Sequence, residues 1–144
     1  MTSFGSVRLG EELPAESRVV TREDVRAYAE ASGDRNPLHL DEAAARAAGF
    51  DGVIAHGMFT MGHLASAVTA WAGGGAFVRR MRVQFRAPVA MGETIVARGR
   101  VRSADPSSRA VVLEAWVDVE RASDGSTEQA IRRGEIEVVF AKER

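Results

Sequence analysis

Residues 57–71 read GMFTMGHLASAVTAW, a stretch without an acidic side chain. When the stretch is drawn as a helix, apolar side chains occur on every side of it: Met58, Met61, Leu64, Ala65, Val68 and Trp71. A helix that is apolar all round is expected to be buried all round. The stretch is too short for a membrane span and carries His63, and its small residues, such as Gly62 and Ser66, let other backbone approach closely. We therefore predict a helix wrapped by a sheet.

Four runs in the second half of the chain predict the strands of that sheet. Apolar and polar residues alternate over residues 80–86, 95–102, 111–120 and 136–140, as they do in strands with one buried face. Turn residues such as Asp105-Pro106 and Asp124-Gly125 separate the later runs, and a short strand over residues 6–9 would make five. We expect an α+β fold of a single domain over residues 1–144, with a curved antiparallel five-stranded sheet wrapped around a long central helix.

Two shorter helices are expected before the central one. Thr21 is a capping residue for a helix that ends at Gly33, and Asp41 caps an alanine-rich helix that ends near Gly49. Between them lies the link DRNPLHL, residues 34–40, in which Pro37 biases the preceding residue away from helical angles. The link is therefore expected to be extended or turned.

Length and composition bound the class of protein. The chain has 144 residues, 45% of them hydrophobic and 27% charged, which is typical of one globular domain. It has no cysteine, which excludes disulfides and thiolate chemistry. The first residues show no signal-peptide pattern, and no window approaches the roughly 18 apolar residues of a membrane span. We expect a cytoplasmic protein that has no membrane partner.

Arginines are concentrated in the middle of the chain. Between residues 79 and 109 they outnumber the acids Glu93 and Asp105: Arg79, Arg80, Arg82, Arg86, Arg98, Arg100, Arg102 and Arg109. Such a cluster would suit an anionic ligand, but a charge run more often forms the solvated outer face of strands. No nucleic-acid-binding motif accompanies it, so no nucleic-acid partner is expected.

Candidate catalytic residues lie on the link between the two short helices. Asp34, Asn36 and His39 precede the segment Ala55-His56-Gly57-Met58, where the start of the central helix offers free backbone N–H groups. Hydration of a thioester needs a base for water, a proton for the α-carbon, and donors for the enolate oxygen. The residues alone leave the alternative of an ordinary Asx turn open, because Asp and Asn are routine turn formers.

Metal sites are weaker interpretations of the same residues. A calcium loop starting at Asp34 would need glycine at its sixth position and Glu at its twelfth, where the chain has His39 and Ala45. A site made of His39 and His56 has no known ligand spacing, so we expect no metal.

Five segments together resemble the signature of the MaoC-like (R)-specific enoyl-CoA hydratases. They follow one another in order along nearly the whole chain: ASGDRNPLH at 31–39, IAHGM at 54–58, FRAPV at 85–89, GET at 92–94 and GRV at 99–101. The chain also resembles the catalytic subunits of (3R)-hydroxyacyl-carrier-protein dehydratases of the mycobacterial type.

The resemblance implies a hot-dog fold and a lyase of fatty acid metabolism, which reversibly hydrates trans-2-enoyl thioesters to (3R)-3-hydroxyacyl thioesters. Asp34 and His39 would jointly hold the water, with Asp34 as base, and the Gly57 amide would bind the thioester oxygen. Asn36 would fix the loop, while His56 at the proposed oxyanion site is expected to support the start of the helix. Met58 would line an acyl tunnel. The substrate would be an acyl-CoA or acyl-carrier-protein thioester, and no cofactor is implied.

Two other functions and two assemblies stay open on the sequence. A non-catalytic or partner-dependent subunit of a heteromeric hydroxyacyl-carrier-protein dehydratase would not need Asp34, His39 and Gly57. A hot-dog thioesterase usually carries its acid on or near the central helix, and residues 57–71 contain none. Pairing through a sheet edge predicts a homodimer, although a heterodimer with a related hot-dog subunit fits the sequence equally well.

Overall fold

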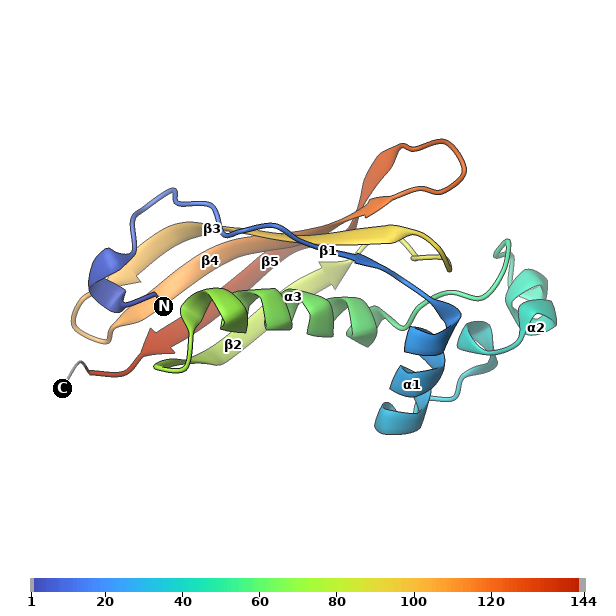
Figure 1. Ribbon diagram of the computed structural model, residues 1–144, viewed down its shortest axis with the longest axis horizontal. Coiled ribbons are helices and arrows are strands. Elements are labelled where there is room, and N and C mark those ends of the chain that lie inside the picture. Colours follow the sequence, from blue (N-terminus) through green and yellow to red (C-terminus); the bar gives the residue numbers. More distant parts are fainter. Residues whose placement is uncertain (1, 143–144) are drawn as a thin grey trace.

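The computed structural model describes residues 2–142, and these form one sheet together with three α-helices and two 3₁₀ turns (Figure 1). The elements in chain order are η1 (Phe4–Ser6), β1 (Glu16–Val19), α1 (Arg22–Ser32), η2 (Pro37–His39), α2 (Glu42–Ala47), α3 (Gly57–Ala72), β2 (Ala76–Phe85), β3 (Thr94–Asp105), β4 (Ala110–Glu120) and β5 (Thr127–Phe140).

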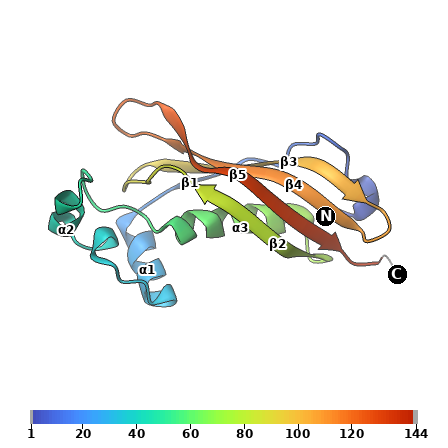
Figure 2. The same ribbon diagram turned by 180° about the vertical axis from the view of Figure 1, so that it is seen from behind.

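The strands form a single antiparallel sheet in the order β1-β3-β4-β5-β2. The sheet curves over α3, which contacts β2, β3, β4 and β5, and helices α1 and α2 lie beyond the first turn of α3 (Figures 1 and 2). The predicted α+β arrangement, a curved five-stranded sheet around a long central helix, is confirmed.

The buried face of the sheet follows from the alternation in the sequence. The side chains that β3 and β4 turn toward α3 are fully buried, and they include Ile95, Ala97, Leu113 and Val117. They pack with Leu64 on α3 to form the core. Burial of aliphatic side chains of this size stabilises a fold by roughly 1.5–3 kcal/mol each, so the alternating pattern supplies the main driving force for this arrangement.

One glycine is required where β5 bulges against β4. The register between these strands shifts after Ala115, and Arg133, just before Gly134, has the left-handed φ of 49°. A Cβ atom on Gly134 would lie 2.3 Å from the carbonyl oxygen of Ala115, which no side chain tolerates. A bulge of this kind adds twist, and the sheet bends over the helix in this region.

The predicted strand over residues 6–9 is wrong. Residues Phe4–Ser6 form the 3₁₀ turn η1, closed by reciprocal hydrogen bonds between Ser3 and Ser6. Arg8 then begins a turn, with the Glu11 amide bonded to its carbonyl oxygen at 3.1 Å. The fifth strand is Glu16–Val19, whose side chains are all exposed, so it has no apolar alternation for a sequence pattern to detect.

The two short helices are confirmed. The Thr21 hydroxyl accepts from the Asp24 amide in a capping box, and Gly33 ends α1 at the left-handed φ of 77°. Asp41 caps α2 through the amides of Ala43 and Ala44. The link between the helices turns at Pro37, as expected.

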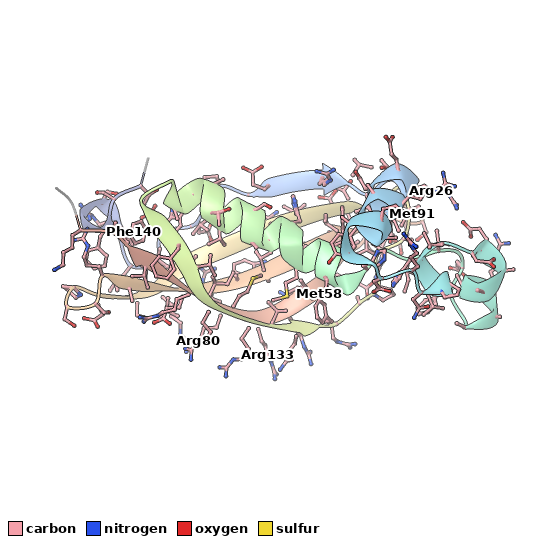
Figure 3. The ribbon with its side chains drawn as sticks, turned by 90° about the horizontal axis from the view of Figure 1, so that it is seen from below. Arg26, Met58, Arg80, Met91, Arg133 and Phe140 are labelled. Carbon is pink, nitrogen blue, oxygen red and sulfur yellow. The ribbon has the colours of Figure 1, made fainter. Side chains whose placement is uncertain are left out.

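The expectation that the central helix is buried all round is wrong for the single chain. Thr60, Leu64 and Val68 face the sheet and are buried, whereas Met58 and Gly62 lie on the opposite face and are exposed. Figure 3 looks onto this face, which neither the sheet nor another helix covers. The sheet therefore shields one side of α3 and leaves an uncharged helix face open.

The arginines of the second half are mostly paired on the outer face of the sheet. Glu135 on β5 lies 3.2 Å from Arg80, 3.6 Å from Arg102 and 3.9 Å from Arg82, between the charged nitrogen and oxygen atoms. Arg98 bonds Asp118 on the neighbouring strand at 2.9 Å. The acids that neutralise the run come from β4, β5 and, for Arg100, from Glu12 near the start of the chain, which is why the local sequence appeared strongly basic.

No helix within residues 2–142 is long and apolar enough to cross a membrane.

Candidate active site

The loop between α1 and α2 is held by side-chain to backbone hydrogen bonds. The Asp34 carboxylate accepts from the amide of Asn36 at 3.2 Å, and the Asn36 side-chain oxygen accepts from the amide of Leu38 at 3.1 Å. Asn36 also adopts the extended angles that a residue before proline prefers, with φ −54° and ψ 130°. The loop therefore turns sharply into η2, and that turn places His39 beside the start of α3.

His39 is oriented by a backbone carbonyl. Its Nδ1 atom lies 2.7 Å from the carbonyl oxygen of Ile54, on the strand-like segment that leads into α3. Because a carbonyl oxygen only accepts, Nδ1 carries the hydrogen and donates it, which leaves a lone pair on Nε2. In its neutral form His39 is thereby fixed as the Nδ1–H tautomer, with Nε2 as the acceptor.

His56, the cap residue of α3, ties the loop between α1 and α2 to the helix. Its side chain is 2% exposed, and its Nε2 atom donates to the carbonyl oxygen of Asp34 at 2.9 Å. The ring stacks on His39 with a centroid distance of 3.8 Å and also contacts Tyr28 at 4.8 Å. These contacts hold His39 and the Asp34 backbone against one buried ring.

The side chains of Asp34, His39 and His56 converge, with one nitrogen or oxygen atom of each lying within 4.8 Å of the others. The ring planes of the two histidines are only 25° apart and stacked. Imidazole lone pairs lie in the ring plane, so stacked rings direct them side by side instead of toward a common ion. This geometry favours acid–base chemistry between a carboxylate and an imidazole over metal binding.

A hollow of about 260 Å³ opens next to this cluster. Its walls come from η2, the start of α3 and the segment before it, the end of β2 and the segment after it, and β5: His39, Ile54, Ala55, Gly57, Thr60, Phe85, Arg86, Ala87, Pro88, Val89 and Ala130. Within residues 2–142 the amide of Gly57 has no hydrogen-bond acceptor, as expected at a helix start. A donor and an imidazole thus face the same hollow.

Gly57 lies where the hollow is narrow. A Cβ atom at this position would come within 3.1 Å of two ring carbons of Phe85. The absence of a side chain keeps the helix N-terminus accessible to a ligand oxygen.

One sequence-based assignment differs from the placement in the structure, and one residue of the hollow was not anticipated. Met58 is 54% exposed on the open face of α3 and does not line the hollow, so the hollow of the single chain gives no support to its role in an acyl tunnel (Figure 3). Thr60, which the sequence analysis did not select, is buried and lines the hollow one turn after Gly57. A lone polar residue on the sheet-facing side of an apolar helix was the signal for it.

A curved antiparallel sheet over one long helix defines a hot-dog fold, and a carboxylate and an imidazole that lie together at the start of that helix form a candidate acid–base site. The family model described as "MaoC like domain" matches residues 6–134. The chain therefore belongs to the MaoC-like domain family.

Relatives in this family carry hydratase and dehydratase names. The chain is 38% identical over 102 residues to the mitochondrial 3-hydroxyacyl-[acyl-carrier-protein] dehydratase of Arabidopsis thaliana, a match that covers 67% of this chain and 60% of that enzyme. It is 31% identical over 98 residues to the (R)-specific enoyl-CoA hydratase of Rhodospirillum rubrum, which covers 67% and 68% of the two chains. Among solved structures, the unliganded R-hydratase PhaJ1 of Pseudomonas aeruginosa superimposes with a TM-score of 0.85 at 27% identity, covering 98% of this chain and 86% of that one.

Proposed function

We propose that this chain is a hydratase or dehydratase that interconverts trans-2-enoyl and (3R)-3-hydroxyacyl thioesters. One observation carries the proposal: the Ile54 carbonyl bonds Nδ1 of His39, which leaves Nε2 of the neutral ring as an acceptor, and a nitrogen of this ring lies within 4.8 Å of a carboxylate oxygen of Asp34. A free amide at Gly57 faces the same hollow, where a thioester oxygen would be held. The relatives named for this chemistry support the same assignment.

The proposed reaction begins with an ionised Asp34 and a neutral His39 that share one water molecule. As the water oxygen bonds to the β-carbon, Asp34 takes a water proton and the C=C electron pair moves toward the thioester. The negative charge that develops on the thioester oxygen is stabilised by the Gly57 N–H. The α-carbon then takes up a proton through the pair, which returns to its starting state. Dehydration is the same path reversed.

Arg86 supports a substrate with a phosphate-bearing arm. It lines the hollow, and no ion pair or hydrogen bond to its guanidinium occurs within residues 2–142. Coenzyme A and the phosphopantetheine of a carrier protein both carry phosphate, for which a guanidinium is a favourable partner. We propose coenzyme A thioesters as the first substrates to test and the carrier-protein thioester as the alternative.

We also propose that a second copy of this chain covers the open face of α3. The face contains no charged side chain, and Phe85, which lies against the start of α3 at the end of the edge strand β2, is 54% exposed. A Gly62→Glu variant tests this, because a side chain at Gly62 meets nothing within 4 Å in the single chain. We expect light scattering to show a dimer for the unmodified chain and for Ala104→Glu on the far hairpin, and a monomer for Gly62→Glu. A dimer that forms only after a related hot-dog subunit is added would instead indicate a heteromer.

The thioesterase alternative makes a different product. Hydrolysis would release free thiol, whereas hydration leaves the thioester intact. The absence of an acidic residue from α3 favours hydration.

Incubation of the purified chain with crotonyl-CoA tests the proposal. We expect loss of the conjugated-thioester absorbance, no thiol detected by a thiol-reactive dye, and a (3R)-3-hydroxybutyryl product by chiral chromatography. Thiol release would replace the proposal with a thioesterase. Inactivity with both crotonyl-CoA and crotonyl-carrier protein, whether alone or with a related hot-dog subunit, would contradict it.

No cofactor enters the proposed reaction, so activity should survive dialysis against a chelator. A cytoplasmic location likewise remains a proposal, which cell fractionation would test.

A further inference from the structure

A buried ion pair lies behind the wall of the hollow. The Glu93 side chain is 6% exposed and that of Arg121 is 16% exposed, and the two bond at 2.8 Å between Oε1 and Nη1. Burying two charges costs free energy that their attraction offsets only when the geometry and the other hydrogen bonds are favourable. Such a pair is therefore weak evidence for a role in stability. The hydrogen bonds that it makes indicate a different role.

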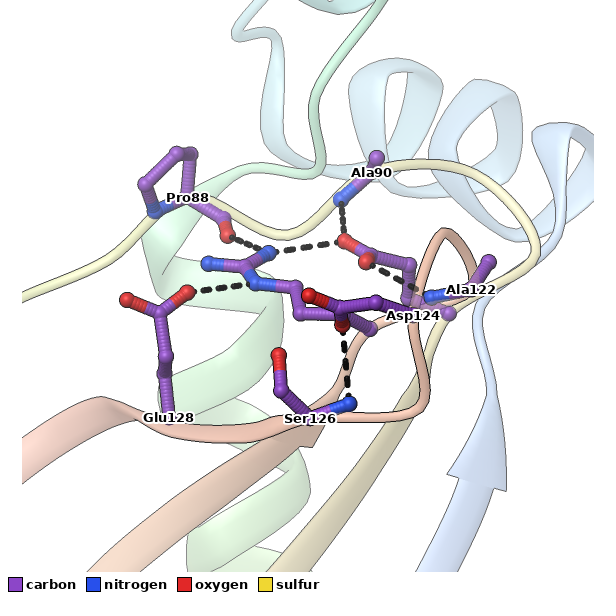
Figure 4. A network of polar contacts seen from close by, with 8 residues as sticks. Pro88, Ala90, Ala122, Asp124, Ser126 and Glu128 are labelled. Atoms are coloured by element: carbon purple, nitrogen blue, oxygen red, sulfur yellow. Dashed lines mark hydrogen bonds and ion pairs between the residues drawn. The ribbon is translucent and has the colours of Figure 1, made fainter.

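Each member of this pair bonds the backbone of one short segment, residues 88–90 (Figure 4). Glu93 accepts from the amides of Ala90 at 2.8 Å and Ala122 at 3.1 Å, while Arg121 donates to the carbonyl oxygen of Pro88 at 2.8 Å. Arg121 also bonds the half-exposed Glu128 at 2.6 Å. Both ends of the segment, one a carbonyl and one an amide, are thus fixed by the same ion pair.

That segment in turn holds the residue that orients His39. Ala90 forms an antiparallel bridge with Ile54, and the amide of Ala55 donates to the carbonyl oxygen of Val89 at 2.8 Å. The carbonyl of Ile54 accepts from His39 Nδ1 at 2.7 Å. A continuous set of hydrogen bonds therefore runs from the ion pair through residues 88–90 and 54–55 to the imidazole.

We infer that Glu93 and Arg121 are positioning residues, which place the Ile54 carbonyl and thereby keep the hydrogen of His39 on Nδ1. Neither side chain touches the imidazole or lines the hollow next to it. If the segment moves, the Ile54 oxygen moves with it, the hydrogen bond to Nδ1 lengthens, and the two neutral tautomers of His39 become closer in energy. The effect on His39 stands on the contacts alone, whereas its catalytic consequence rests on the proposed function.

Four variants separate this positioning role from a general effect on stability. Glu93→Gln places an amide where two N–H donors and a guanidinium need a carboxylate, and Arg121→Met removes the cation. Arg121→Lys keeps the charge but cannot reach Pro88, Glu93 and Glu128 together. Asp118→Asn is the matched control, because Asp118 also pairs with an arginine but does so on the outer face of the sheet.

The primary measurement is the tautomer of His39 by nitrogen-15 NMR at a pH where the ring is neutral. The chain has 3 histidines, so His56→Gln and His63→Gln variants complete the assignment. We expect a single Nδ1–H form in the unmodified chain and in Asp118→Asn, a mixture in Glu93→Gln and Arg121→Met, and a smaller change in Arg121→Lys. If Glu93→Gln does not fold, the tautomer of His39 in Arg121→Lys provides the test.

The second measurement is the kinetics of crotonyl-CoA hydration. We expect kcat to fall by about 100-fold in Glu93→Gln and Arg121→Met while KM stays within about twofold, since a misplacement of 1 Å can cost that much. The inference would be overturned if His39 kept the single Nδ1–H form in the folded Glu93→Gln and Arg121→Met variants. If only Arg121→Lys folds, the same result in that variant would overturn it. An unmodified chain that is inactive with both crotonyl-CoA and crotonyl-carrier protein, alone or with a related hot-dog subunit, would contradict the proposed function, and the tautomer measurement would still test the inference about His39.

Discussion

Replacing Gly57 by alanine should reduce activity far more than stability. The new Cβ atom would lie 3.1 Å from the Cδ1 and Cε1 atoms of Phe85, a few tenths of an ångström inside the normal carbon contact distance. Phe85 is 54% exposed, so its ring can move by that amount. We expect a steric cost below about 1 kcal/mol, and the higher helix propensity of alanine offsets part of it.

The methyl group nevertheless enters the hollow between the helix start and Phe85, where the thioester oxygen must approach the amide. Loss of one oxyanion donor lowers kcat by roughly 100-fold to 1,000-fold in other enzymes. We therefore expect Gly57→Ala to lose about 100-fold in kcat/KM for crotonyl-CoA. The midpoint of thermal unfolding should change by no more than about 4 °C.

Gly75→Ala is the matched control, because a Cβ there meets nothing within 4 Å and the position lies at the other end of α3. The control should keep its activity. Full activity in Gly57→Ala would refute the argument that this amide binds the thioester oxygen. A large loss of stability would show that the Phe85 ring cannot move aside for the new methyl group.

Three further changes test the fold. Gly134→Ala places a Cβ 2.3 Å from the carbonyl oxygen of Ala115, so calorimetry should show a loss of about 2 kcal/mol or more as the bulge is forced open. The hydrogen bond from Arg18 holds the pKa of Asp24 below its usual range, and the stability this gives is complete above the ordinary Asp pKa and is lost as the pH falls through the lowered pKa. Urea unfolding should therefore show that Asp24→Asn is less stable than the unmodified chain at pH 7 and that the difference disappears in acid. Asn36→Ala removes the side-chain acceptor of the Leu38 amide, so urea unfolding should show a loss of about 1 kcal/mol, with a larger proportional loss of activity because the loop carries Asp34.

The sequence predicted those parts of the fold in which local pattern and burial agree. β3 and β4 alternate in sequence and are buried on one face, and α1 has both its cap and its terminating glycine. β1 escaped detection because its position is set by backbone pairing to β3 across a long separation, while its four side chains are exposed. The open face of α3 shows a different limit: an apolar pattern indicates that a surface is to be covered, and it does not say by which chain.

The site was predicted in part for a similar reason. Asp34 and His39 are close in sequence, so their clustering could be anticipated from a turn at Pro37. The Ile54 carbonyl that orients His39 and the Glu93–Arg121 pair behind it have no local signature, because backbone carbonyls carry no sequence information and the two charged residues lie on different strand ends. Glu93 was noted as an acid among arginines and as part of the GET segment, and neither observation indicates the burial that distinguishes it.

The interdependence of Asp34 and His39 tests the proposed mechanism most directly. Hydration of crotonyl-CoA should be measured for Asp34→Asn, His39→Ala and the double variant, with folding checked by circular dichroism. If the two side chains hold one water as a unit, each single variant should lose roughly 100-fold to 10,000-fold in kcat, and the double variant should lose little more than the worse single one. Losses that multiply in the double variant, or a single variant that keeps full activity, would contradict a shared role in activating water.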